Sequence, residues 1–510
     1  MENAAFDSCD EIRKDELSAE VKPNLEVTNG LELKRKVGLF SGVALIVGSG
    51  IFISPGGVLQ RSGSVGLSLI MWAACGLLAI LGSLSYAELG TLIPKSGGEY
   101  SYLIDGLSPL HPFWGPLPAF LYSWISVLLL RPTTFAVGCL SCASYTIYPI
   151  LASMGLCLGT ETEDLLIKVT AVLYIGLITA LNCYSVDWTI RVQNFFTVAK
   201  LVAIAVLIGC GIYQLSTGET QYLAQGFEGS TTEFGTIATA FYGGLWAYDG
   251  WYQDRGCVMN NLNFITEEIK NPYVNLPRAI MIGIPLVTVC YLAVNVAYLT
   301  VLSPQALINS DAVAVDVGNY LLGPLAFTIP LAVAMSTFGG VLTGAFSTGR
   351  LCFATAREGH MIDVLSYIHV DSRIPSPALI FTAIIALILV ISKNVSSLID
   401  FFTFAVWIFY VLTMIVLLIL RKTRPDARRP YKVPLFVPIL TIIIGSYLIV
   451  APIVTEPAVE YLYVLGVLFV GFLVYIPFVY YKCSLGFMGP ITKFIQLTLS
   501  VGPTLKPMSD

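Results

Sequence analysis

Apolar stretches of about 20 residues recur from one end of the chain to the other. A helix needs about 20 largely apolar residues to cross the hydrocarbon core of a bilayer, and its backbone polar groups must be paired within the helix there. The pattern therefore predicts an all-α polytopic membrane protein. The twelve predicted spans are 38–64, 66–94, 114–144, 165–184, 192–213, 235–253, 278–302, 319–349, 375–392, 397–420, 434–454 and 460–481.

The composition excludes several classes of function. Only 12% of the residues are charged and 56% are hydrophobic, whereas soluble domains carry about 25% charged residues. The chain has three histidines, and its eleven cysteines show no paired or metal-ligand spacing. We therefore expect no enzyme, no metal and no cofactor. A net charge of −5 gives no nucleic-acid footprint.

Basic residues gather in alternate loops. Residues 34–36 are Lys-Arg-Lys, and the loop 421–432 contains six Lys or Arg. Cytoplasmic loops carry the excess of basic residues, so both termini are predicted to be cytoplasmic. The polar segment 1–33 has no apolar signal-peptide core and is predicted to be a disordered tail. The loops expected on the other side contain no Lys or Arg: 145–164, 214–234, 303–318 and 455–459.

Glycines interrupt two of the predicted spans. The first contains Gly48-Ser49-Gly50, and the sixth contains "FYGGLWAYDGW" at 241–251. They are five spans apart and so cross in opposite directions. Broken helices at matching positions of two inverted halves indicate a transporter's midplane site, where freed N–H groups and a helix dipole receive a carboxylate. Small-residue packing between helices is the alternative, and composition alone leaves both open.

Several long motifs point to one family. "SGIF", "AELGTLIPKSGGEY", "LWAYDGW", "LNFITEEIKNPYVNLPRAI" and "REGHM" occur in this order over residues 34–482. Together they resemble the light subunits of heteromeric amino acid transporters, within the amino acid–polyamine–organocation superfamily. "AYDGW" is similar to the branch that exchanges dibasic amino acids and cystine for neutral ones.

The resemblance implies a LeuT-like fold, with five plus five inverted helices, two of them broken, and two extra spans. It implies a twelve-span transporter domain at 34–482 between the N-terminal tail and a cytoplasmic C-terminal tail at 483–510. It also implies sodium-independent exchange of cationic and neutral amino acids, with cystine a candidate, across the plasma membrane. The substrate-binding residues would be Gly48, Ser49, Gly50, Ile51, Trp246, Ala247 and Asp249.

Two residues of the sixth span carry specific expectations. An ionised Asp249 within an apolar span costs ~2.5–3.5 kcal/mol, which a cationic substrate could offset. The alternative is an aspartate that caps the broken helix. By resemblance, Trp246 is the gate that covers the substrate from outside. A plain core aromatic is the alternative for Trp246.

Lys200 is an intramembrane cation in "FTVAKLVAIAV". In a LeuT-like fold it could stand where sodium binds in relatives, which fits exchange without sodium. The alternative is a lysine that snorkels to the cytoplasmic edge.

The predicted outer surface holds a candidate partner site. An unpaired cysteine in an oxidising compartment suggests an intermolecular bridge, and Cys157 lies in such a loop. The family links a cysteine near this position to a single-span heavy-chain glycoprotein, whereas the alternative is a free thiol. Asn394 begins a glycosylation sequon close to two spans. The other expected partners are the amino acid substrates and the lipid bilayer.

The chain departs from the family pattern near the predicted site. About four residues are missing before Gly48, which removes roughly one helical turn. "DRGCVMNN" at 254–261 is inserted after the sixth-span motif, and "LSPLHPFW" at 107–114 lengthens the turn before the third span. Two other readings remain: a single-subunit permease or proton-coupled symporter, and a non-transporting regulatory protein or inactive isoform.

Overall fold

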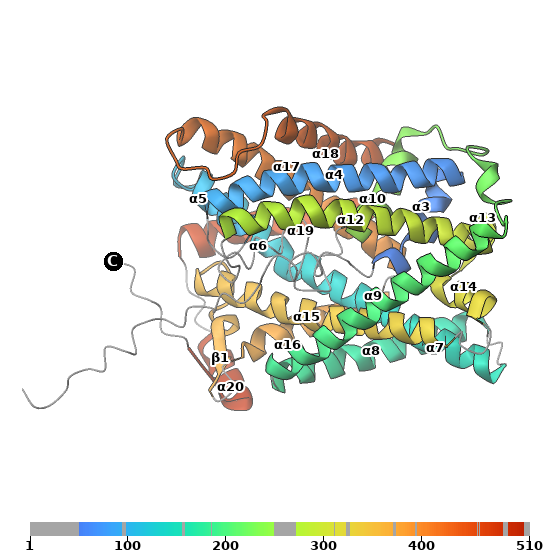
Figure 1. Cartoon of the computed structure of the whole chain (residues 1–510). Coiled ribbons are helices and arrows are strands. Elements are labelled where there is room, and N and C mark those ends of the chain that lie inside the picture. Colours follow the sequence, from blue (N-terminus) through green and yellow to red (C-terminus); the bar gives the residue numbers. More distant parts are fainter. Residues whose placement is uncertain are drawn as a thin grey trace, which may run out of the picture. The chain divides into compact units, whose positions relative to one another are not determined.

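The computed structural model of the chain divides into two units, residues 1–36 and 37–510. The first unit lies outside the described residues. Within the second unit the described part is built almost entirely of helices (Figure 1). The structure describes residues 50–93, 98–155, 159–184, 186–248, 272–310, 312–322, 327–370, 374–392, 395–455, 457, 459–482 and 488–503.

The elements fall into long helices, short helices and two short strands. The long helices are α4 (Val65–Leu92), α7 (Arg131–Met154), α8 (Thr160–Tyr184), α9 (Val186–Ser216), α10 (Phe234–Tyr248), α12 (Pro272–Val301), α15 (Thr328–Arg357), α16 (Ser376–Ser392), α17 (Val395–Thr423), α18 (Phe436–Thr455) and α19 (Val459–Val474). The shorter α-helices are α3 (Pro55–Ser62), α5 (Glu99–Leu107), α6 (Leu117–Ile125), α13 (Pro304–Asn309), α14 (Val313–Leu322) and α20 (Met488–Leu499). Three short 3₁₀ segments are η1 (Gly50–Phe52), η3 (Leu223–Gln225) and η6 (Asp363–Ser366). Two π-helical segments are η2 (Ser126–Leu130) and η7 (Tyr475–Tyr480). The two strands are β1 (Tyr367–His369) and β2 (Val501–Pro503).

Each predicted span contains helix within its described residues. In the described part, eight helical stretches are long and apolar enough to cross a membrane, and Thr328–Leu342 and Ser376–Ile391 are shorter apolar stretches. The first glycine-containing span corresponds to η1 with α3. The sixth corresponds to α10, which runs without a break through Gly243 and Gly244 to Tyr248, so the break predicted for 241–251 does not occur up to that residue, and 249–271 lie outside the described residues. The polytopic all-α class is confirmed, whereas the count of twelve crossings stays a prediction because length and composition are its only criteria.

The predicted eighth span is misplaced at both ends. The expected range was 319–349, but the long helix α15 runs from Thr328 to Arg357. Residues up to Leu322 belong to the separate helix α14. The sequence places Gly323 and Pro324 between the two, and both residue types disfavour a helix interior. Hydropathy averaged over a window does not register such a breaker.

Helix packing divides the bundle into two groups. α3, α4, α10 and α12 form one group, here the α4 group, in which α4 packs against α12 and α10. α7, α8, α15 and α16 form the α7 group, centred on the contact of α7 with α15. α9 contacts both α12 and α15, crossing α15 obliquely in Figure 1, and thereby joins the groups.

Burial separates central helices from peripheral ones. Along Leu117–Leu151, 94% of the most apolar window is buried inside the protein, against 17% along Tyr461–Tyr480. A helix that is apolar all round but exposed on most of its surface faces lipid. α7 is therefore a central helix, and α19 is a peripheral helix with a lipid-facing surface.

Loops meet in two sets at opposite ends of α4. The Gly66 N–H donates to the Gly226 carbonyl at 2.7 Å, so the loops after the first and fifth spans lie together. Beyond the other end of α4, Arg424 Nη2 donates to the Asp105 carbonyl at 2.9 Å, so the loops after the second and tenth spans meet. Both contacts agree with the alternation that the basic residues predict.

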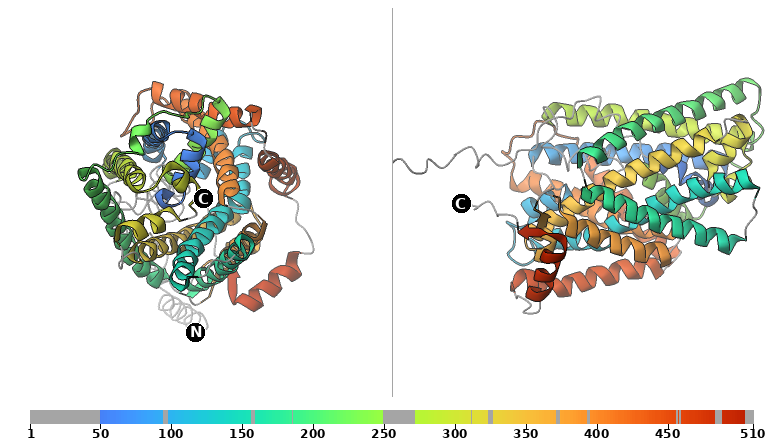
Figure 2. Two further views of the ribbon diagram at one scale, coloured as in Figure 1. Left: turned by 90° about the vertical axis from the view of Figure 1, so that its right-hand side faces the viewer. Right: turned by 90° about the horizontal axis from the view of Figure 1, so that it is seen from below.

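The C-terminal segment carries structure that hydropathy did not predict. β2 pairs antiparallel with β1, with Ile368 opposite Gly502. Ile495 of α20 packs against a small buried cluster that includes Cys352 and Val364. Figure 1 labels β1 and α20 at one end of the helices, and the right-hand view of Figure 2 shows the dark red α20 there from another side. α20 and β2 thus pack against the segment between α15 and α16.

Candidate functional site

The described part of the first span is broken. η1 ends at Phe52 and α3 begins at Pro55, which has no N–H to donate. The Gly50 carbonyl accepts the N–H groups of Ile53 and Ser54 at 3.0 and 3.1 Å, and the Ser54 hydroxyl at 3.1 Å. The Ile53 N–H makes the i→i−3 bond of a 3₁₀ turn, and the Ser54 N–H makes a regular i→i−4 bond that leads into α3. Gly48 and Ser49 lie outside the described residues, while Gly50 and Ile51 are buried.

The first and sixth spans touch at Gly50 and Ala247. A Cβ built on Gly50 would lie 2.5 Å from the Cα of Ala247 and 3.1 Å from its Cβ. No side chain fits there, because real Cβ atoms do not approach a backbone carbon so closely. The predicted meeting of the two spans is therefore a direct contact between backbones, and the binding role of both residues stays a prediction.

Buried tyrosines hold the carbonyl groups beside this contact. Tyr145 of α7 donates its hydroxyl to the Phe52 carbonyl at 2.5 Å, and Tyr291 of α12 donates to the Ala247 carbonyl at 3.0 Å. A buried carbonyl left without a donor would cost about 1–3 kcal/mol. We did not predict a role for either tyrosine from the sequence. The available signal was a phenol inside an apolar span, which needs a partner when buried.

Trp246 lies one residue before the backbone contact and is 6% exposed. Its indole meets the ring of Phe402 edge to face, with centroids 5.0 Å apart. Phe402 belongs to α17, so this contact joins α10 to a helix outside the α4 group. The arrangement suits a cover over the site, and the gating role stays a prediction.

An ion pair lies two helical turns from Trp246. Arg61 of α3 meets Asp400 of α17 in a bidentate contact, with N–O distances of 2.9 and 2.6 Å. Arg61 Nη1 also donates to the Thr239 carbonyl of α10 at 2.8 Å. Seven residues separate Thr239 from Trp246, which places them on one face of α10. The Arg61 guanidinium of α3 thus bonds to both α10 and α17.

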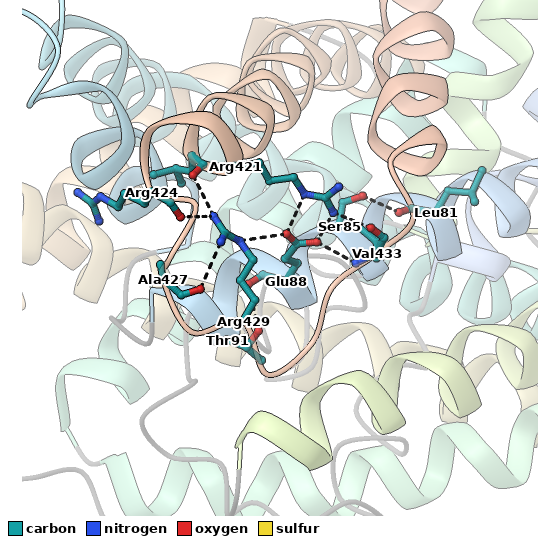
Figure 3. A network of polar contacts seen from close by, with 10 residues as sticks. Leu81, Ser85, Glu88, Thr91, Arg421, Arg424, Ala427, Arg429 and Val433 are labelled. Carbon is teal, nitrogen blue, oxygen red and sulfur yellow. Dashed lines mark hydrogen bonds and ion pairs between the residues drawn. The ribbon is translucent and has the colours of Figure 1, made fainter.

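A second ion-pair network closes the far end of α4 (Figure 3). The buried Glu88 accepts Arg421 Nε at 2.9 Å and the Val433 N–H at 2.8 Å, and Arg429 Nε lies 3.6 Å away. A buried carboxylate is tolerated because cations and N–H groups surround it. The network fastens the basic loop after α17 to α4.

Lys200 is the predicted site residue whose burial decides between two readings. Its side chain is 1% exposed within α9, the helix that contacts both groups. A snorkelling lysine would bring its ammonium to the surface, so burial argues against that reading. Its role in place of sodium stays a prediction.

Four further predictions concern residues that the structure does not describe. Asp249, Cys157, Asn394 and the insert 254–261 lie outside the described residues. Of the predicted substrate-binding residues, the structure brings together Gly50 and Ala247, with Ile51 and Trp246 beside them in the chain.

Comparisons with known proteins agree on one family. The family model described as amino acid permease matches residues 37–483. The chain is 47% identical over 480 residues to the mouse b(0,+)-type amino acid transporter 1, covering 93% of this chain and 94% of that protein. Identity to the human protein of that name is 45% over 477 residues, covering 92% and 94%. The human large neutral amino acids transporter small subunit 2 is 43% identical over 437 residues, covering 84% and 78%.

Proposed function

The chain belongs to the amino acid permease family, and from that membership we propose that it exchanges cationic and neutral amino acids across the plasma membrane without sodium. Cystine is included among its substrates. Two types of similar transporter, one named for large neutral amino acids, support amino acids as the cargo. The observation that carries the proposal is the backbone contact of Gly50 with Ala247, where the first and sixth spans meet.

Backbone groups at this contact would bind the part common to all amino acids. Unwound segments offer N–H groups to a carboxylate and carbonyls to an ammonium. Gly50, Ile51 and Ala247, with Gly48 and Ser49, would form this zwitterion site. Asp249 follows Trp246 by three residues and would attract a cationic side chain.

Transport would proceed by alternating access. The Trp246–Phe402 contact and the Arg61–Asp400 pair would close the site from outside. The Glu88 network with Arg421 would close the cytoplasmic end. Each closure must loosen in turn while the α4 group rocks against the α7 group. Lys200, buried in the joining helix α9, would supply the fixed charge that sodium supplies in relatives.

The proposed assembly is a light subunit with a single-span heavy chain. Cys157 would form the disulfide with that partner on the outer side, and both termini would be cytoplasmic. The alternation of basic loops and the two sets of loop contacts support this orientation. In this arrangement residues 34–482 form the transporter domain between the tails 1–33 and 483–510.

Counterflow in proteoliposomes tests the proposal. Vesicles loaded with unlabelled leucine are expected to accumulate labelled arginine, leucine and cystine without sodium, and empty vesicles far less. Equal uptake by empty vesicles that follows a proton gradient would favour the single-subunit symporter. A protein that binds its heavy chain but moves no amino acid would favour the non-transporting role.

The Asp249→Asn variant tests the cation site in the same assay. The amide keeps the size of the side chain but removes its charge. Arginine uptake is expected to disappear while some leucine uptake remains. Unchanged arginine uptake would overturn the role of Asp249 and leave exchange itself intact.

A further inference from the structure

Glu99 is a buried carboxyl group that the transport site does not use. It is the first residue of α5, in the segment between the second and third spans, and its exposed fraction is 0%. Tyr86 donates its hydroxyl to Oε1 at 3.3 Å, and Tyr122 donates to Oε2 at 3.1 Å. The loop contacts assign this segment to the end of α4 that the basic loops mark as cytoplasmic.

The groups around Glu99 come from every element packed on it. Tyr86 belongs to α4, Tyr102 to α5 itself, Tyr122 to α6 and Arg131 to the start of α7. α17 contributes Tyr410, whose ring meets that of Tyr86 at 6.0 Å. The buried Tyr102 hydroxyl has no hydrogen-bond partner among the described residues. Among the described residues, Arg131 is the cation whose charge lowers the pKa of Glu99.

This environment favours the neutral carboxyl group. Burial raises the pKa of Glu99 from 4.5 to about 7, against the opposing effects of its own backbone N–H, Arg131 and the two phenols. The raised value means that Glu99 contributes stability below pH 4.5 and that this contribution is lost as the pH rises through 7. His360 does not titrate in the same range, because burial lowers its pKa to about 4.

Glu99 also lies at the joint between the two packing groups. Tyr86 stands on α4, whereas Tyr122 and Arg131 belong to the segment that continues into α7. The neighbouring Tyr100 hydroxyl lies 3.0 Å from Nδ1 of His360, just beyond α15 of the α7 group. A change of charge on Glu99 therefore acts where the groups must move past each other.

We propose that Glu99 is a proton-binding site whose occupancy makes the rate of exchange depend on cytoplasmic pH. This inference rests on the proposed exchange. The proton passes between the Glu99 carboxyl group and cytoplasmic water and is not carried across the membrane. Protonation favours the buried arrangement seen here, and ionisation favours an arrangement in which water reaches the carboxylate and the joint opens.

Linkage sets the size of the effect. A carboxyl group with a pKa of about 7 when buried and 4.5 when hydrated favours the hydrated arrangement about tenfold more at pH 8 than at pH 6. Opening the joint is part of the transport cycle, so exchange is expected to speed up as internal pH rises. External pH should have little effect, which distinguishes regulation from proton-coupled transport.

The test varies internal pH from 6 to 8 in proteoliposomes at fixed external pH. Wild-type exchange should rise by up to about tenfold, and Glu99→Gln, which imitates the protonated group, should give a flat and slow profile. Glu358→Gln is the matched control, because Glu358 is an exposed carboxylate that acts on Tyr100 in the same region. A Glu99→Gln variant that keeps the wild-type profile overturns the proposal.

A second measurement does not depend on transport. The infrared carboxyl band that disappears in Glu99→Gln should titrate near pH 7 in the wild-type protein. A band that titrates near 4.5 overturns the proton site even if exchange occurs. Failure of counterflow with all amino acids, together with a band at pH 7, would instead refute the exchange and retain the proton site.

Discussion

At the scale of single residues, the feature that decides most is the absence of a side chain at Gly50. The close approach of Ala247 requires glycine there for space alone, since a Cβ would overlap the neighbouring backbone. The carbonyls beside the contact are held by the hydroxyls of Tyr145 and Tyr291 from two other helices. The backbone geometry at this contact thus depends on side chains from two other helices.

Gly50→Ala is expected to impair both stability and transport. The added methyl group must displace the backbone of α10, and overpacking of this kind costs about 1–3 kcal/mol. The melting temperature in detergent should fall, and counterflow should fall at least tenfold. Gly57→Ala is the control, because a Cβ at Gly57 meets nothing within 4 Å. Equal behaviour of the two variants would show that the contact is not as tight as described.

At the scale of elements, α17 contacts both the first and the sixth span. α3 reaches it through Arg61 and Asp400, and α10 reaches it through Trp246 and Phe402. The ion pair is partly exposed, with side-chain exposures of 23% and 21%. Pairs of that kind contribute about 0.2–1 kcal/mol, enough to bias a conformational equilibrium without locking it.

Arg61→Gln should open the outer side more often. Loss of the pair is expected to raise the outward-open population by about two- to fivefold, which corresponds to about 0.4–1 kcal/mol. A cysteine introduced at Thr239, which is buried in α10, should then react faster with a membrane-impermeant maleimide. The exchanged pair Arg61→Asp with Asp400→Arg should restore slow labelling.

Lys168→Gln is the control for that experiment. Lys168 pairs with Asp164 at 2.8 Å within α8, so its loss removes an ion pair without untying any helix from another. If Lys168→Gln speeds labelling as much as Arg61→Gln does, the effect is a general one of charge. In that case Arg61 and Asp400 are not a closure.

At the scale of the whole described domain, two polar clusters join α4 to its surroundings. The Glu88 network joins α4 to α17 and the basic loop after it, and the Glu99 cluster joins α4 to the segment that continues into α7. The peripheral helices expose apolar side chains, as expected for a surface in lipid. The described helices of this one compact unit thus pack as two groups inside one apolar envelope.

Cys157→Ser should separate the chain from a heavy subunit. Co-expressed with the partner, the wild-type protein is expected to run as a high-mass band on a non-reducing gel, and the variant is not. Surface delivery should fall if the disulfide stabilises the pair. Cys210→Ser is the control, since Cys210 lies within the apolar helix α9. A wild-type protein that reaches the surface alone and forms no such band would favour a single-subunit permease.

Much of the fold could be predicted from hydropathy, because each span satisfies its own backbone and must be apolar whatever its neighbours are. α8 and α17 therefore begin and end near the predicted residues, while α15 does not. The break predicted at Gly48-Ser49-Gly50 is described only from Gly50, where a short 3₁₀ turn precedes α3. The pairing of β1 with β2 was not, since two three-residue strands separated by more than 100 residues leave no periodic signal.

By itself the sequence determined that the chain is a multi-pass helical membrane protein and which loops lie at the same end of the bundle. These features follow from local composition, because each helix must by itself be long and apolar enough to cross the bilayer. Only the tertiary structure decided that Gly50 abuts Ala247, that Arg61 pairs with Asp400, and that Glu99 is buried among phenols beside Arg131. Such contacts join residues far apart in the chain, and their geometry depends on how the helices pack against one another.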